Sequence, residues 1–251
     1  MLDISFIPAF KDNYIWLLRR GNEAIVVDPG DAAPVRARLA TEGLRLSAIL
    51  ITHHHADHQG GVAELLADSA VPVYGPLAES ITGCSVPLSG GECFELLGER
   101  FTVINVPGHT AGHIAYALPG AVFCGDTLFA GGCGRLFEGT PAQMLVSLGK
   151  LAELPDDTLI YCAHEYTEAN LRFALAVEPE NGAIAERLAA VSKRRLAGEA
   201  TVPSSLYEER ATNPFLRSHV PAVIAAAKVQ GSPGGSELEV FTAIRAWKNV
   251  F

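Results

Sequence analysis

Long apolar runs and an excess of positive charge are both missing from this chain of 251 residues. No apolar stretch reaches the roughly 20 residues that a membrane-spanning helix needs, so we expect no membrane partner. The chain has 19 Lys and Arg against 28 Asp and Glu, and this formal charge of −9 disfavours a general nucleic-acid partner. Residues 1–5 show neither a basic start nor a following apolar stretch, so we expect no signal peptide and a cytoplasmic location.

Cysteine is scarce, and its spacing does not suggest pairing. The five cysteines are an odd number and contain no Cys-x-x-Cys pair, which favours free thiols in a reducing compartment over a disulfide framework. Cys124 and Cys162 lie in apolar, strand-like stretches, so we expect core packing rather than metal binding. The hydrophobic content of 49% is that of an ordinary globular protein.

Histidine, in contrast, is concentrated in one segment. Residues 52–58 contain the pattern His-x-His-x-Asp-His, directly after an apolar stretch at 46–51 that predicts a buried strand. Residues two apart on an extended chain point to the same side, so His53 and His55 are placed to share one metal ion. Asp57 and His58 come after the chain has begun to turn, which suits a second ion.

Other polar residues also follow apolar strands. We expect strands at 3–7, 13–19, 23–28, 46–51, 71–74, 92–97, 100–106, 113–118, 121–124 and 158–163. Helices are expected at 34–42, from 59 onward and at 141–154. His53, His109, Asp126 and His164 each follow the end of such a strand. Because strand ends on one side of a sheet are neighbours in space, we expect these four segments to meet.

The character of the chain changes after His164. Helix-like stretches at 167–178, 181–198, 221–229 and 236–250 follow, with a Gly/Pro-marked linker at 231–235. Ser236 and Glu239 form a predicted capping box, and Leu238, Phe241 and Ile244 form an apolar stripe. We therefore predict a first domain at 1–166 and an α-helical addition at 167–251.

The candidate ligands are seven: His53, His55, Asp57, His58, His109, Asp126 and His164. Seven ligands are too many for one tetrahedral zinc ion and suit two ions. We assign His53, His55 and His109 to the first ion. Asp57, His58 and His164 are assigned to the second, with Asp126 as the bridge. Nitrogen and oxygen ligands accept zinc, iron or manganese, and we expect zinc.

This ligand set predicts hydrolytic chemistry. Two close cations lower the pKa of a water between them to about 7, so hydroxide is available at neutral pH as the nucleophile. Asp57 and Asp126 are accordingly the predicted catalytic carboxylates. His54 and His113 are expected to orient ligands or to pack beside them.

These motifs resemble the metallo-β-lactamase superfamily, whose first motif is matched by residues 27–30. The resemblance implies an α+β fold, a four-layer αβ/βα sandwich, with a binuclear metal site. Within the superfamily the chain is similar to the glyoxalase II family of hydroxyacylglutathione hydrolases. The segments that match that family are 52–61, 125–129, 132–135, 137–140, 164–167 and 213–215. The resemblance implies hydrolysis of S-D-lactoylglutathione to D-lactate and glutathione, in methylglyoxal detoxification. It also implies that residues 1–166 are the catalytic domain and that residues 167–251 are a helical, substrate-binding domain.

The family also implies where glutathione binds. The matching positions are Arg135, Phe137, Tyr166, Arg245 and Lys248. The family often has Lys and Tyr at the first two of these positions. Arg135 keeps the positive charge, whereas Phe137 lacks the hydroxyl. The expected partner is a small glutathione thioester, bound by a monomer.

Other functions remain open at this stage. One group stays in the same fold: a lactonase-like hydrolase, a β-lactamase, a nuclease or a persulfide dioxygenase with a single iron. A metal-binding protein without catalysis is the other class. A complete second set of ligands argues against the mononuclear dioxygenase, and the acidic balance argues against a nuclease.

Overall fold

A computed structural model describes residues 2–251 of the protein and divides them into two compact units. The first unit runs to Asn105 and also contains Thr110–Gly125. The second unit contains Val106–His109 and Asp126–Phe251. Within residues 2–251, no helix combines the length and hydrophobicity that crossing a membrane would require.

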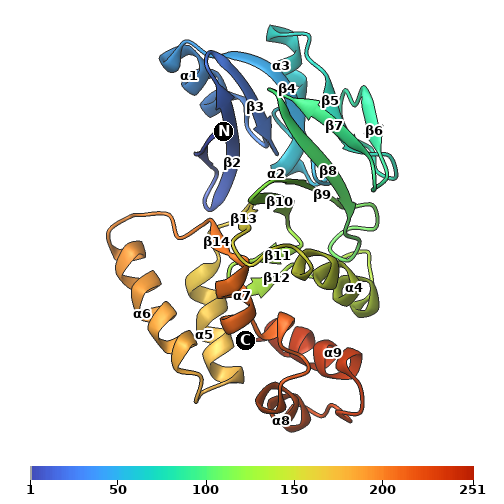
Figure 1. Ribbon diagram of the computed structural model, residues 1–251, viewed down its shortest axis with the longest axis vertical. Helices are drawn as coiled ribbons and strands as arrows, with labels where there is room; N and C mark the ends of the chain where they lie inside the picture. The colour runs from blue at the N-terminus through green and yellow to red at the C-terminus, as the bar shows by residue number, and fades with distance from the viewer. Residues whose placement is uncertain (1) are drawn as a thin grey trace. The chain divides into compact units, whose positions relative to one another are not determined.

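The first unit contains a six-stranded sheet in the order β1-β2-β3-β4-β5-β6 (Figure 1). The strands are β1 (Asp3–Ala9), β2 (Asn13–Arg20), β3 (Glu23–Val27), β4 (Arg45–Leu50), β5 (Val73–Pro76) and β6 (Val86–Leu88). Neighbouring strands from β1 to β3 pair antiparallel, and neighbouring strands from β3 to β6 pair parallel. Helices α1 (Ala32–Glu42) and α3 (Val62–Asp68) pack on this sheet through a core that includes Val35, Val62 and Leu65.

Four further strands of the first unit form an antiparallel ladder in the order β10-β9-β8-β7. They are β7 (Cys93–Leu96), β8 (Glu99–Asn105), β9 (Ile114–Leu118) and β10 (Ala121–Gly125). Aromatic side chains join this ladder to the first sheet. The rings of Trp16 and Phe123 lie 6.5 Å apart, and the buried Tyr116 hydroxyl donates to the Ile51 carbonyl at 2.8 Å. The core of the first unit therefore lies between two layers of strands.

The second unit is mainly helical and carries short strands. Its strands are β11 (Leu128–Phe129), β12 (Gly132–Cys133), β13 (Leu159–Cys162) and β14 (Ser204–Ser205). Its helices are α4 (Pro141–Ala152), α5 (Thr167–Val177), α6 (Gly182–Leu196), α7 (Leu206–Thr212), α8 (Pro221–Val229), α9 (Glu237–Lys248) and the 3₁₀ turn η1 (Pro214–Leu216). Helices α5 and α6 run side by side and bury Leu171, Ile184 and Val191 (Figure 1).

Several local predictions are confirmed by the backbone. Gly43 ends α1 in the left-handed conformation, and Ser236 with Glu239 forms a complete capping box at α9. Cys124 and Cys162 are fully buried, and burial raises the pKa of the Cys162 thiol to about 12. All five cysteines are free thiols.

The differences from prediction are confined to short elements and edges. The helix expected from 59 onward is two helices, α2 (Ala56–Gln59) and α3. They are separated by Gly60 and Gly61, where a Cβ would meet neighbouring backbone atoms. Strands β6, β11, β12 and β14 and helix α7 were not predicted, since two to seven residues carry too little periodicity. Leu238 is 39% exposed, so the apolar stripe of α9 consists of Phe241 and Ile244 with Val240.

Candidate metal centre

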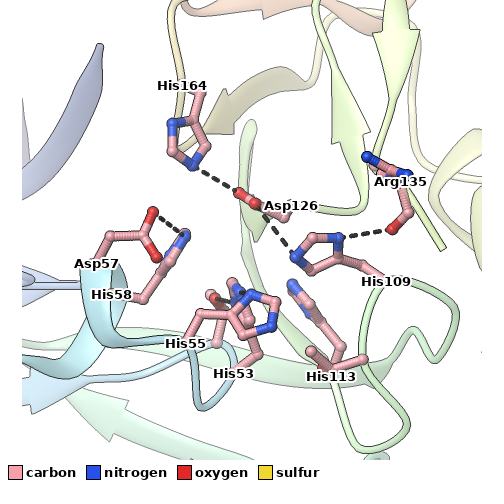
Figure 2. A network of polar contacts seen from close by, with 12 residues as sticks. His53, His55, Asp57, His58, His109, His113, Asp126, Arg135 and His164 are labelled. Carbon is pink, nitrogen blue, oxygen red and sulfur yellow. Dashed lines mark hydrogen bonds and ion pairs between the residues drawn. The ribbon is translucent and has the colours of Figure 1, made fainter. Parts of the chain in front are cut away.

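The first unit brings four of the predicted ligands into one short segment after β4. His53 and His55 lie on the extended chain before α2, and Asp57 and His58 lie within that helix. The Nε2 atom of His53 lies 3.1 Å from Nδ1 of His55, and Nε2 of His58 lies 3.5 Å from Oδ2 of Asp57 (Figure 2). The segment therefore presents two pairs of donor atoms.

Asp28, at the end of β3, fixes the ring orientation of two of these histidines. Its carboxylate accepts from Nδ1 of His58 at 3.0 Å and from the Thr52 hydroxyl at 2.7 Å. The same hydroxyl lies 3.0 Å from Nδ1 of His53, so it accepts from that nitrogen. Both rings thus carry their proton on Nδ1, which leaves the Nε2 lone pair for a metal ion.

Asp28 adopts a left-handed backbone conformation, with φ of 53°. This conformation is uncommon for a residue with a side chain and is found most often where function requires it. Its cost is offset by the hydrogen bonds that the buried carboxylate accepts, including one from the Thr52 backbone N–H at 2.8 Å.

Two more side chains support the ligand segment. The amide of Asn13 donates to Oδ2 of Asp57 at 3.0 Å, which sets the rotation of that carboxylate. The ring of His113 stacks on that of His53 with centroids 4.5 Å apart, and its Nδ1 donates to the Ile114 carbonyl at 3.1 Å. His113 lies directly before β9 rather than inside it, in the supporting position expected for it.

The second unit brings together the remaining three ligands. Asp126 lies between two imidazoles: its Oδ2 is 3.4 Å from Nε2 of His109, and its Oδ1 is 3.3 Å from Nε2 of His164 (Figure 2). The Nδ1 atom of His109 donates to the Arg135 carbonyl at 2.7 Å, so its Nε2 faces the carboxylate as an acceptor. All three side chains are buried. A carboxylate with each oxygen directed at a different imidazole has the arrangement of a bridging ligand.

The donor sets fit a divalent metal ion. Zinc bonds of about 2.0 to 2.1 Å in a tetrahedral arrangement place neighbouring donor atoms roughly 3.3 Å apart. The four pairs of donors described above lie at 3.1 to 3.5 Å. The residues are the nitrogen and carboxylate ligands that zinc, iron and manganese accept. The protein therefore carries histidine and aspartate clusters suited to divalent metal binding.

Three of the predicted substrate residues lie beside the second-unit ligands. The Phe137 ring, 61% exposed, meets the His109 ring edge-on at 5.3 Å, and the Arg135 guanidinium lies 5.5 Å from the centre of the Phe137 ring. The Tyr166 ring stacks parallel on His164 with centroids 4.8 Å apart. An exposed aromatic ring thus adjoins each of the two histidines, and a guanidinium accompanies the ring beside His109.

Arg245 and Lys248, on α9, have different surroundings. Arg245 is buried, donates to the Cys133 carbonyl at 2.8 Å and lies over the Phe215 ring at 5.0 Å. Lys248 is half-buried, with its ammonium 5.2 Å from the centre of the Phe173 ring. Burial lowers the pKa of Lys248, and the positive charge of Arg245 lowers it further. Arg245 therefore has a structural contact in addition to any role in binding.

Sequence reasoning did not assign the supporting residues Thr52 and Asn13, and it noted Asp28 only as part of a family motif. Their hydrogen-bond partners lie 24 to 44 residues away along the chain, apart from the neighbouring His53. Local spacing therefore carries no signal for them. Only the left-handed turn at Asp28, before Pro29-Gly30, had a visible signature.

Comparisons with known proteins agree with this geometry. Residues 10–164 match the model of the metallo-beta-lactamase superfamily, and residues 165–251 match that of the hydroxyacylglutathione hydrolase C-terminus. Two solved structures share the fold. ETHE1 from Myxococcus xanthus has a TM-score of 0.69 at 24% identity, over 98% of this chain and 91% of that one. The BLEG-1 B3 metallo-beta-lactamase has a TM-score of 0.65 at 23% identity, over 85% of this chain and 99% of that one. The predicted α+β sandwich with a helical C-terminal region is confirmed.

The curated relatives are similar over their full length. A hydroxyacylglutathione hydrolase of Dechloromonas aromatica (strain RCB) is 63% identical over 100% of both chains. Another, from Alkalilimnicola ehrlichii (strain ATCC BAA-1101 / DSM 17681 / MLHE-1), is 59% identical over 99% of both. Because full-length identity at this level accompanies both family matches, the chain belongs to the hydroxyacylglutathione hydrolase family of the metallo-β-lactamase superfamily.

Proposed function

We propose that this protein is a thioester hydrolase that converts S-(2-hydroxyacyl)glutathione, such as S-D-lactoylglutathione, and water to a 2-hydroxy acid and glutathione. The observation that carries the proposal is full-length identity of 63% and 59% to hydroxyacylglutathione hydrolases, in a chain whose His and Asp side chains form clusters suited to metal binding. The product acid identifies the reaction with methylglyoxal detoxification.

The proposed centre holds two divalent ions. His53, His55 and His109 are assigned to the first ion and Asp57, His58 and His164 to the second, with Asp126 shared. The two facing imidazoles at Asp126 support the shared role, since each of its oxygens lies within 3.4 Å of one of them. Zinc is the proposed metal because imidazole and carboxylate suit it. When bound, the ions supply Lewis acidity, polarise the thioester carbonyl and make hydroxide available at neutral pH.

The chain itself fixes the geometry that this chemistry needs. Asp28 and the Arg135 carbonyl accept hydrogen bonds from Nδ1 of His58 and His109, so each imidazole is held in one orientation with Nε2 directed away from these partners. Asn13 donates to Oδ2 of Asp57, the oxygen that lies 3.5 Å from Nε2 of His58, and thereby fixes the rotation of this carboxylate. The leaving group is a thiol with an ordinary pKa of about 8.5, so it departs as a thiolate without a strong general acid.

Binding of the anionic glutathione part requires cations, because the net charge of −9 repels it at long range. We assign this role to Arg135, Arg245 and Lys248, with Tyr166 and Phe137 as contact surfaces. We further propose the functional division at 1–166 and 167–251, in which the helical region supplies Arg245 and Lys248. The five free thiols support a reducing, cytoplasmic location, and we propose a monomer.

The test is a substrate panel with metal analysis on the same sample. S-D-lactoylglutathione, a small non-glutathione thioester, a lactone, a β-lactam and a persulfide with oxygen are compared, and zinc, iron and manganese are measured by mass spectrometry. We expect the glutathione thioester to be hydrolysed fastest and two ions per chain. Chelation should abolish the activity and zinc should restore it. A chain that oxidised the persulfide, or preferred the lactone, would contradict the proposal.

A further inference from the structure

One buried carboxylate, that of Glu79, lies between β5 and β6 and is absent from the predicted ligand set. Its side chain is 3% exposed. Four donors converge on it. Oε2 accepts from the backbone N–H of His54 at 2.6 Å and lies 2.9 Å from Nδ1 of the same residue. Oε1 accepts from the Thr110 hydroxyl at 2.5 Å and from the Gly112 N–H at 2.9 Å. A carboxylate is acceptor-only, so it satisfies all four at once.

The surrounding segment is built around this contact. Gln59 donates to the carbonyls of His54 and Ser80 and accepts from the Thr82 N–H at 2.7 Å. Both backbone polar groups of His54 are therefore held, the N–H by Glu79 and the carbonyl by Gln59 of α2. A Cβ on Gly112 would approach Cγ of Glu79 to 2.7 Å, so a glycine is needed for the chain to come this close.

The three ligands assigned to the first ion are all adjacent to these contacts. His54 lies between His53 and His55, and Thr110 directly follows His109. None of the four contacts of Glu79 involves or directly adjoins Asp57, His58 or His164, the ligands assigned to the second ion. We propose that Glu79 is a positioning residue specific to the first ion, holding the backbone beside all three of its histidines. This inference rests on the proposed binuclear function.

Glu79→Gln is the informative variant. The amide nitrogen of Gln must face either the His54 donors or the Thr110 and Gly112 donors. In both cases a backbone N–H meets another N–H, so one side of the contact is lost. We expect affinity for one of the two zinc ions to fall about tenfold, within the range for residues that orient metal ligands. After dialysis against a weak chelator, the variant should hold about one ion per chain.

Glu92 provides a matched control within the same unit. Its carboxylate accepts from a hydroxyl and a backbone N–H of Ser89 and from the Gly90 N–H, in a turn that contains no predicted ligand. Glu92→Gln makes the same chemical change with the same kinds of donors. This variant should keep two ions and wild-type turnover. Equal zinc retention in Glu79→Gln and Glu92→Gln across a chelator titration would overturn the proposal.

The identity of the lost ion is tested by cobalt substitution. The visible spectrum of cobalt-loaded Glu79→Gln at one ion per chain should match that of His55→Ala and differ from that of His58→Ala. A match to His58→Ala would overturn the assignment. If Glu79→Gln does not fold, Thr110→Val serves in its place. This variant removes only the hydroxyl contact and should lower the affinity for the same ion several-fold. Unchanged zinc affinity in Thr110→Val would then count against the proposal.

The wild-type measurements separate the two levels of inference. A wild type with two ions and thioesterase activity, together with an unaffected Glu79→Gln, would leave the proposed function intact and remove the role of Glu79. A wild type that binds fewer than two ions would overturn both, whereas one that binds two ions without hydrolysing the glutathione thioester would overturn the proposed function alone.

Discussion

For three of the five candidate histidines, the Nδ1 partner places the proton. His58 meets a carboxylate, His53 meets the hydroxyl of Thr52, and His109 meets the Arg135 carbonyl. Each partner is an acceptor, so each ring has its proton on Nδ1 and its lone pair on Nε2. A ring fixed in this way loses little freedom when it binds a metal, and this favours tight binding.

Replacing Asp126 tests its assignment as the shared ligand. We expect Asp126→Ala to lower kcat/KM for S-D-lactoylglutathione by more than about 100-fold, which is the upper end of the loss typical of residues that only orient metal ligands. The physical reason is that both of its oxygens face imidazoles. The exposed Asp157 serves as control, and Asp157→Ala should retain activity. Full turnover by Asp126→Ala with two ions bound would contradict the assignment.

Lys248 tests recognition of glutathione. Arg245 also holds the Cys133 carbonyl, so Lys248→Ala removes a cation with less disturbance of the fold. We expect KM to rise about tenfold for the glutathione thioester, the equivalent of roughly 1.4 kcal/mol, and little for a small neutral thioester. Lys193→Ala, on the exposed face of α6, is the control. Equal changes of KM for both substrates would show that Lys248 does not recognise glutathione.

Among the elements, the β11–β12 hairpin depends on the helices for its polar groups. Asn213 donates to the carbonyls of Phe129 and Gly132 at 3.2 and 2.9 Å, and Asn170 of α5 donates to that of Ala130 at 3.1 Å. The Gly131 N–H donates to the buried Glu209 carboxylate at 2.8 Å. The hairpin links Asp126 to Arg135, so the helical region fixes the chain between a metal ligand and a substrate residue.

Removing the Asn213 side chain should therefore destabilise the protein. Asn213→Ala leaves two buried carbonyls without this donor, at about 1 to 3 kcal/mol each, so we expect a loss of about 3 kcal/mol in the free energy of unfolding. Asn181→Ala is the control. Asn181 caps α6, and its replacement should lower the free energy of unfolding by only about 1 kcal/mol. Urea denaturation measures both. Equal losses would show that the hairpin contacts contribute nothing beyond a helix cap.

For the whole molecule, the division into compact units and the proposed functional division do not coincide. The second unit contains His109, Asp126 and His164 together with every helix from α4 to α9. A chain cut at residue 166 therefore loses most of a unit that contains three of the seven predicted ligands. The helical region supplies packing partners as well as candidate substrate contacts.

A fragment of residues 1–166 tests this dependence. It lacks Asn170, Glu209 and Asn213, the partners of the β11–β12 hairpin. We expect it to bind fewer than two zinc ions and to have no thioesterase activity, as measured by metal analysis and substrate turnover. Adding the separate 167–251 peptide should restore neither, unless that peptide folds alone. An active 1–166 fragment would show that the helices serve only to bind glutathione.

The sequence by itself determined the fold class, most of the long elements and the set of candidate ligands. It did so because ligand chemistry belongs to side-chain types, and because local spacing controls which side an extended chain presents. The Ser236 and Glu239 capping box and the Gly43 helix end are likewise local, so they were predictable. Short elements such as β11 and α7 were not, since they carry too few residues for a periodic signal.

Only the tertiary structure decided which residues orient the ligands. Glu79 contacts Gly112 from 33 residues away, Asp28 contacts His58 from 30, and Arg245 reaches Cys133 from 112. Nothing in the local pattern marks one carboxylate as a hydrogen-bond acceptor for a metal loop and another as a surface charge. That distinction depends on burial and on donors contributed by distant segments, which exist only once the chain has folded.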